Sequence, residues 1–326
     1  MHPKMQPNLT SPHHLPIQAY IKKGVCKEQG ANFVKLKELA VLFTLAALFG
    51  SSFLFVRIAS PAIGPFLTSQ GRVTFGALGL LAIVLLFRKS VDFRLRWKQY
   101  FIIGALNSAI PFTLVSLAAI HLNASLLAII NAMVPFFTAI AVWAWLKEKL
   151  VFAKGLGIVL GLIGVVITVG WSPVEPSLEV FLASLCSLLS TVSYAFGGVY
   201  AKKTFRNCSP LAVTTGQLVG ATLLLIPITL VGFPEQTLNI TPAVLPAVLG
   251  VALFSTALGY LLYYYLIEHV GPTKTVTVTF LIPPFGMIWG AIFLDEQITP
   301  GMIAGLLIIL GSLALITGIG KKRSRE

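Results

Sequence analysis

"IINAMVPFFTAIAVWAWLKEKL", residues 129–150, returns later in the chain as "VTFLIPPFGMIWGAIFLDEQIT", residues 278–299. A shift of 148 positions pairs Pro135 with Pro283 and Glu148 with Glu296. Matches of rare residue types in register are hard to obtain by chance, so the two stretches indicate an internal duplication. Both are apolar over roughly the 20 residues that a helix needs to cross the hydrocarbon of a membrane.

The duplication extends upstream, where a shift of 145 positions pairs Pro65 with Pro210 and Arg72 with Gln217. The three-residue change between the two shifts falls in a loop or at a helix end. A repeat of this length implies that the chain consists of two halves of similar architecture.

The two repeats define the predicted domain organisation. We expect a first repeat over 38–171 and a second over 178–319. Residues 1–37 are polar at first and lack the apolar core of a signal peptide, so they are interpreted as a disordered cytoplasmic tail. Residues 320–326 form a short basic tail on the same side.

The composition indicates that lipid surrounds most of the chain. The protein has 326 residues, of which 56% are hydrophobic and 11% are charged, whereas soluble domains carry about 25% charged residues. The net charge of +13 comes from short basic runs between apolar blocks. That placement is typical of membrane proteins, so we expect no nucleic-acid partner.

The apolar blocks predict an all-α integral membrane protein with ten transmembrane helices. Each block is close to the length required to cross the bilayer. The predicted spans are 38–56, 66–87, 99–119, 123–145, 152–171, 179–199, 211–231, 243–266, 274–294 and 300–319.

The basic residues predict the orientation. With ten spans and a cytoplasmic N-terminus, 22 of the 24 Lys and Arg residues lie on the cytoplasmic side, as the positive-inside rule requires. We therefore expect a multi-pass protein of the cytoplasmic (inner) membrane with both termini in the cytoplasm. Five spans in each half force the halves into opposite orientations, which makes them inverted repeats.

Polar side chains inside the spans indicate a shared cavity. Hydrocarbon penalises unpaired polar groups, and one water-filled cavity would satisfy many of them together. Serine and threonine can instead bond back to their own helix, which the amide side chains cannot do so easily, and ordinary packing is the alternative for the tyrosines. The candidate substrate-pathway residues are Arg72, Asn107, Asn131, Tyr194, Gln217 and Tyr260. The run from Tyr263 to Tyr265 is interpreted instead as an aromatic belt at the cytoplasmic interface.

Arg72 has two interpretations. An arginine within a span costs a few kcal/mol on insertion scales, so it needs a partner or a function. It is either a structural anchor that bonds helix carbonyls or Glu296, or a group that holds a carboxylate or phosphate of the substrate.

Four residues are candidates for gating or coupling. Pro135 and Pro283 each remove a backbone hydrogen bond at equivalent places, so they are either bending points for alternating access or static kinks. Glu148 and Glu296 are candidate proton carriers near helix ends, with helix capping as the alternative for both.

Spans five and ten, 152–171 and 300–319, are almost wholly apolar. Their paired glycines, Gly157 with Gly161 and Gly301 with Gly305, have the GxxxG spacing that lets helix backbones approach closely. We interpret these spans as peripheral helices that pack tightly within the monomer or form a homodimer face.

These motifs resemble the EamA-type transporters of the drug/metabolite transporter superfamily. The resemblance covers about 38–319 and includes "LFGSSFLFVRIA", "PFLTSQGRVTFGALGLL" and the two motifs quoted first. It implies ten helices around a central cavity and the movement of small metabolites, often outward.

The expected function is secondary transport of a small polar metabolite, such as an amino acid or a drug-like compound, with efflux as the expected direction. A passive facilitator or exchanger is the first alternative and a membrane-embedded enzyme the second. The chain has no HExxH, no GxSxG and no multi-carboxylate cluster, so we expect no catalytic residues, cofactor or metal.

Overall fold

The structure is a computed structural model that describes residues 36–147, 152–206, 208–233, 240–275 and 277–317. The residues from Lys37 onward form one compact unit. The rest of both predicted tails lies outside the described residues, but Leu36 and Lys37 already belong to the first helix.

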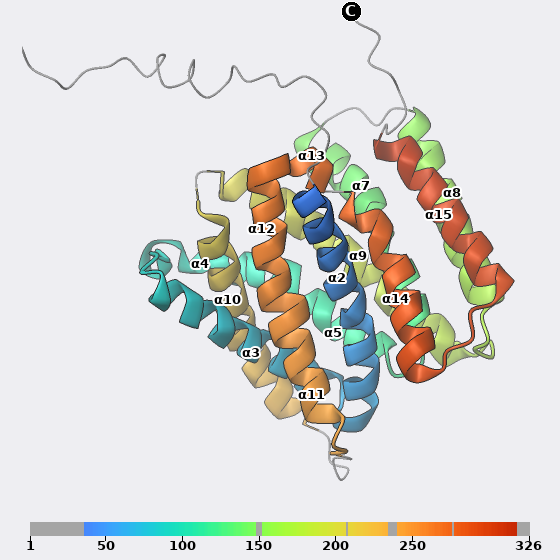
Figure 1. The fold of residues 1–326 in the computed structure, drawn as a ribbon, viewed down its shortest axis with the longest axis horizontal. Coiled ribbons are helices and arrows are strands. Elements are labelled where there is room, and N and C mark those ends of the chain that lie inside the picture. The colour runs from blue at the N-terminus through green and yellow to red at the C-terminus, as the bar shows by residue number, and fades with distance from the viewer. Residues whose placement is uncertain (1–35, 148–151, 207, 234–239, 276, 318–326) are drawn as a thin grey trace, which may run out of the picture. The chain divides into compact units, whose positions relative to one another are not determined.

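The first half of the unit contains five spans (Figure 1). Spans three and four are each assembled from shorter segments. The elements are α2 (Leu36–Ile63), α3 (Pro65–Leu86), α4 (Phe93–Gly104) with η1 (Ala105–Ala109) and α5 (Ile110–Ala118), α6 (Ala124–Asn131) with α7 (Val134–Leu146), and α8 (Phe152–Gly170).

The second half repeats this order. Its third span is again assembled from three segments, and a short helix precedes its fourth. The elements are α9 (Leu178–Thr204), α10 (Pro210–Val231), α11 (Val244–Leu249) with η2 (Gly250–Leu258) and α12 (Gly259–Val270), α13 (Pro272–Thr275) with α14 (Val278–Leu294), and α15 (Pro300–Thr317).

These helices confirm the predicted all-α membrane fold. In the described part of the chain, eight spans are long and apolar enough to cross a membrane, and two shorter apolar helices, Val278–Leu294 and Pro300–Ile316, complete the ten. α3 and α10 both begin with the paired prolines Pro65 and Pro210, because proline suits the first helical turn.

The first span differs most from its prediction. The apolar block was expected to end at residue 56, before Arg57, but α2 continues to Ile63. The Arg57 guanidinium donates hydrogen bonds to the carbonyls of Ala119 and Ile120 at 2.6 and 2.9 Å. Because the neighbouring span supplies these acceptors, the charged residue does not end the helix.

Spans three and eight contain equivalent π-helical segments that the sequence did not predict. η1 carries Asn107 and η2 carries Ser255, two positions that are 148 residues apart. A π-helical turn adds a residue to the helical repeat and therefore changes which side chains face inward. Such turns occur frequently at functional sites.

The paired prolines act differently on spans four and nine. Span four breaks at residues 132–133 and restarts with Pro135 in the first turn of α7. Pro283 lies within the continuous helix α14. Among the described residues the second half is also interrupted, because α13 ends at Thr275 and α14 begins at Val278, but this interruption precedes Pro283. The bending role of the two prolines stays a prediction.

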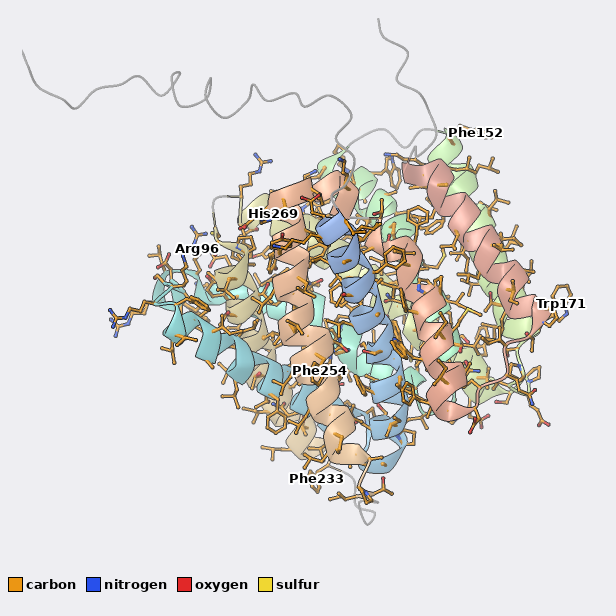
Figure 2. The ribbon with its side chains drawn as sticks, viewed as in Figure 1. Arg96, Phe152, Trp171, Phe233, Phe254 and His269 are labelled. Atoms are coloured by element: carbon orange, nitrogen blue, oxygen red, sulfur yellow. The ribbon has the colours of Figure 1, made fainter. Side chains whose placement is uncertain are left out.

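The spans run alternately between two edges of the bundle. Figure 2 places Phe152 and His269 at one edge, and Trp171 and Phe233 at the opposite edge. The start of α2 and the end of α15 lie at the edge of Phe152 (Figure 1). We call this edge the terminal edge and the opposite one the distal edge. α9 follows Trp171, so it starts at the distal edge, opposite to α2.

α8 and α15 pack against each other through their glycines. A Cβ atom on Gly164 would lie 3.0 Å from the Gly305 carbonyl oxygen, and a Cβ atom on Gly157 would lie 3.1 Å from the Ser312 carbonyl oxygen. The glycines therefore allow the two helix backbones to approach closely. Outward side chains such as Val166 are exposed. The GxxxG glycines thus serve packing inside the chain, and the homodimer stays a prediction.

Candidate functional site

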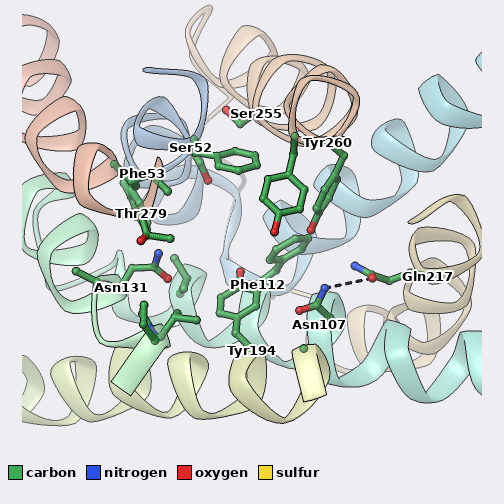
Figure 3. Close-up of a pocket in the computed structure, with 18 of the residues that line it drawn as sticks. Ser52, Phe53, Asn107, Phe112, Asn131, Tyr194, Gln217, Ser255, Tyr260 and Thr279 are labelled. Atoms are coloured by element: carbon green, nitrogen blue, oxygen red, sulfur yellow. Dashed lines mark hydrogen bonds between the residues drawn. The ribbon is translucent and has the colours of Figure 1, made fainter. Parts of the chain in front are cut away.

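A cavity of about 490 Å³ lies among the spans of both halves (Figure 3). Its described lining comes from eight of the ten spans and includes no residue of α8 or α15, in agreement with their peripheral interpretation. The cavity brings together all six candidate pathway residues and both paired prolines: Arg72, Asn107, Asn131, Tyr194, Gln217, Tyr260, Pro135 and Pro283.

The lining follows the internal repeat. Arg72 faces the same cavity as its partner Gln217, and Asn131 shares it with Thr279, which lies 148 positions later. Most other lining positions also fall into pairs: Phe49 with Tyr194, Phe53 with Gly198, Asn107 with Ser255, Phe112 with Tyr260, Val115 with Tyr263, Val134 with Ile282, and Pro135 with Pro283. Equivalent residues from both halves therefore surround one space.

Arg72 is held in place by η2 and α5. Its side chain is 8% exposed, and Nε donates a hydrogen bond to Thr256 Oγ1 at 3.2 Å. The Thr256 hydroxyl in turn donates to the Val251 carbonyl at 2.8 Å. The guanidinium lies over the Phe112 ring, 3.6 Å from its centre, a cation–π contact that gains strength away from water.

A chain of amides lies at one side of the cavity. Asn107 Nδ2 donates to Gln217 Oε1 at 3.2 Å, and Gln217 Nε2 donates to Ser108 Oγ at 2.8 Å (Figure 3). These bonds join η1 to α10, so the two candidate amides belong to one network across the two halves. Asn131 lies on the other side of the cavity, near Thr279 (Figure 3).

Aromatic rings form much of the remaining wall. Phe112, Tyr194 and Tyr260 point toward the centre of the cavity (Figure 3), and the rings of Phe112 and Tyr194 are 6.3 Å apart. Tyr263 and Tyr264 also line it, and Tyr264 shares a hydrogen bond with Thr214. The aromatic-belt interpretation is therefore wrong for these two tyrosines, because α12 turns that face inward.

Sequence reasoning missed the phenylalanines of the site. Phe49, Phe53 and Phe112 line the cavity, but apolar residues in apolar spans carry no signal that separates a cavity wall from a lipid contact. The pairing of Phe112 with Tyr260 at the 148-residue shift was a usable clue.

Glu296 lies in a separate cleft at the distal edge, which it lines together with Arg57 and Asn123. Its carboxylate accepts hydrogen bonds from the backbone N–H groups of Ala124 and Ser125 at 2.6 and 3.0 Å, and from Ser125 Oγ at 2.5 Å. It thus caps α6, as its second interpretation expected. Its negative charge also suits the positive end of the helix dipole.

The structure does not pair Arg72 with Glu296. The proposed structural bond between them is wrong, because the two side chains lie in different clefts and bond to other residues. Glu148, the fourth gating candidate, lies outside the described residues.

Ten apolar spans, eight of which line a cavity that contains a few polar groups, define a multi-pass membrane protein of the transporter class. The sequence matches the EamA-like transporter family twice, at residues 36–170 and 181–318. The chain belongs to this family and is a membrane transporter.

Known proteins similar to this chain span nearly its whole length. The Uncharacterized transporter YvbV of Bacillus subtilis (strain 168) is 29% identical over 290 residues, which cover 86% of this chain and 92% of that protein. Protein PecM of Dickeya dadantii (strain 3937) is 24% identical over 290 residues, which cover 88% of this chain and 93% of that protein.

A solved structure shares the fold. A chain titled "Crystal structure of protein" superposes with a TM-score of 0.63 at 16% sequence identity. The similarity covers 89% of this chain and 99% of that one.

Proposed function

We propose that this protein is a secondary transporter that exports a small polar metabolite, such as an amino acid or a drug-like compound, across the cytoplasmic membrane by alternating access. The observation that carries the proposal is the cavity, which residues of both repeats line in equivalent pairs. Transporters built from inverted repeats bind their substrate at the repeat interface near the middle of the membrane.

The size and chemistry of the cavity support solute binding. Small-molecule pockets have volumes of about 300–1,000 Å³ and are mostly apolar with a few polar groups, and this cavity of about 490 Å³ lies within that range. Its polar groups are one buried guanidinium, three amides and several hydroxyls. Side chains that only packed helices together would not need so many polar atoms around one space.

The two edges of the bundle differ in a way that supports alternating access. Ala201 near the end of α9, Val213 near the start of α10 and Thr279 at the start of α14 line the cavity, so it reaches toward the terminal edge. At the distal edge, Arg57 and Glu296 hold the two ends of the turn between α5 and α6.

This turn forms the distal latch, which consists of Arg57, Glu296 and residues 119–125. Arg57 binds carbonyl groups where α5 ends, and Glu296 binds N–H groups where α6 begins. Each charge therefore matches the helix end it contacts. We propose that the latch keeps the distal edge closed while the cavity is open toward the cytoplasm, and that it releases for export.

Facilitated diffusion or exchange is the second candidate mechanism. Among the described residues that line the cavity, Arg72 is the charged one and none is Asp, Glu or His. Proton-coupled transporters normally carry such a group on the ion pathway. A cavity with this lining is suited to movement driven by the substrate gradient itself.

Purified protein in liposomes tests the proposal. We expect counterflow of a labelled amino acid or other polar metabolite, without chemical change of the solute. The matched variants are Asn131→Leu in the cavity, expected to abolish the flux, and Val166→Leu on the exposed face of α8, expected to preserve it. Chemical turnover, or flux that neither variant changes, would contradict transport through this cavity. A pH gradient that fails to drive accumulation would favour the exchanger.

A further inference from the structure

The guanidinium of Arg72 is oriented with one edge available to a ligand. Within the described part of the chain, the guanidinium makes one hydrogen bond, which Nε donates to Thr256 Oγ1. One face of the group is stacked on Phe112. These two contacts fix the plane of the guanidinium, which lines the cavity. The two terminal nitrogens of such a fork match the two oxygens of a carboxylate.

The charge of Arg72 has no anionic partner among the described residues around the cavity. The lining contains no acidic side chain, and Glu296 is engaged with the start of α6. A charge that is 8% exposed is costly unless a counter-charge or several hydrogen bonds offset it. A bound anion would supply the missing negative charge.

The single positive charge of Arg72 can balance one negative charge on a ligand in the cavity. No Lys, His or second Arg belongs to its described lining. The second charge of a phosphate monoester or a dicarboxylate would be buried without a partner, and an ammonium ion would meet a like charge. Burial of an unpaired charge strongly disfavours each of these ligands.

The surroundings of Arg72 select the body of the ligand. Phe112 lies beneath the guanidinium, Tyr194 lies beside Phe112, and Tyr260 faces both across the cavity (Figure 3). Such walls favour flat apolar groups, because aromatic rings gain energy from stacked and edge-to-face contacts in addition to burial.

We infer that the cavity selects monocarboxylates with an aromatic or flat apolar body, with the carboxylate on Arg72 and the body against Phe112, Tyr194 and Tyr260. The inference rests on the proposed transport function and narrows its substrate to monoanions without an ammonium group, which sets amino acids aside in favour of other carboxylates. Dianions, neutral analogues and amines with the same body are selected against.

Four probes that share one phenyl ring test the charge selection on the wild-type protein. They are phenylacetate, phenylacetamide, phenethylamine and phenyl phosphate, titrated calorimetrically into the full-length protein in lipid nanodiscs. We expect phenylacetate to bind about tenfold to hundredfold more tightly than phenylacetamide, because hydrogen bonds between charged groups are the strong ones. The amine and the phosphate are expected to bind more weakly than the amide.

Variants then locate the selection at Arg72. Arg72→Gln is expected to remove the preference for phenylacetate over phenylacetamide, so that the ratio of the two affinities falls to about one. The matched control is Arg206→Gln, at an exposed turn after α9, which is expected to keep the preference. If Arg72→Gln does not fold, the wild-type ranking of the four probes still decides the outcome.

Equal binding of the carboxylate and the amide overturns the inference, as does preference for the amine or the phosphate. Absence of binding by all four probes at millimolar concentration overturns it as well. Counterflow of solutes with another charge would leave the transport function in place and contradict only the charge selection. Absence of flux for every solute would instead count against transport.

Discussion

Replacement of Glu296 by glutamine tests the distal latch most directly. The side-chain shape is kept, but the negative charge is lost and one acceptor oxygen becomes an NH₂ group. In the structure the carboxylate accepts two backbone N–H groups and the Ser125 hydroxyl. After the substitution, one of the two bonded oxygens is replaced by a donor that faces these donors.

The structure gives the magnitude of this effect. A hydrogen bond to a charged group contributes about 1.5–3 kcal/mol, and a charge at a helix terminus about 0.3–1 kcal/mol more. Loss of one such bond together with the charge therefore weakens the closed distal edge by about 2–4 kcal/mol. Because 1.4 kcal/mol corresponds to a factor of about ten, the open population should rise about 30-fold to 700-fold.

Cysteine labelling from the distal side measures this opening. Ser52→Cys places a thiol in the cavity, where a membrane-impermeant maleimide added on the distal side reaches it only when that edge opens. We expect Glu296→Gln to raise the labelling rate by the factor given above. The background protein has its three native cysteines replaced by serine: Cys26, Cys186 and Cys208.

The neighbouring acid provides the control for charge. Asp295 is exposed and precedes Glu296 directly, so Asp295→Asn removes the same charge at the same edge without changing the cap of α6. We expect wild-type labelling for Asp295→Asn. The latch is refuted if the two substitutions change the rate equally, or if Glu296→Gln leaves the rate unchanged while the protein stays folded.

Three further outcomes follow from the same contacts. Pro135→Ala should slow counterflow severalfold, since it restores a backbone donor at the break in span four; an unchanged rate would remove the bending role. Thr256→Val should weaken phenylacetate binding about tenfold in calorimetry, because Nε of Arg72 loses its acceptor. Thr256→Ser keeps the hydroxyl and should keep the wild-type affinity. Equal affinities of the two variants would show that the bond does not position Arg72. Gly305→Leu should lower the free energy of unfolding by about 1–3 kcal/mol in thermal unfolding, because a Cβ atom there would lie 2.6 Å from the Gly164 carbonyl oxygen. Gly311 lies in open space, so Gly311→Ala should leave the stability unchanged. Equal melting temperatures of the two variants would contradict the packing of α8 against α15.

The spans and their repetition could be read from the sequence because lipid imposes local rules. Each span must satisfy its own backbone polar groups and needs a long apolar run, so hydropathy reports its existence without knowledge of its neighbours. Paired rare residues such as Pro135 and Pro283 then revealed the duplication. For the same reason, polar residues such as Asn107 and Asn131 stood out as cavity candidates.

The tertiary structure alone decided which partners these side chains have. Nothing in the sequence indicated that Arg72 rests on Phe112 and Thr256, or that the helix capped by Glu296 is α6. The face of a helix that turns inward depends on π-helical turns and on how all ten spans pack, and neither leaves a local pattern. Sequence thus determined which segments cross the membrane, whereas packing decided which side chains meet, because contacts between distant spans arise only when the bundle is assembled.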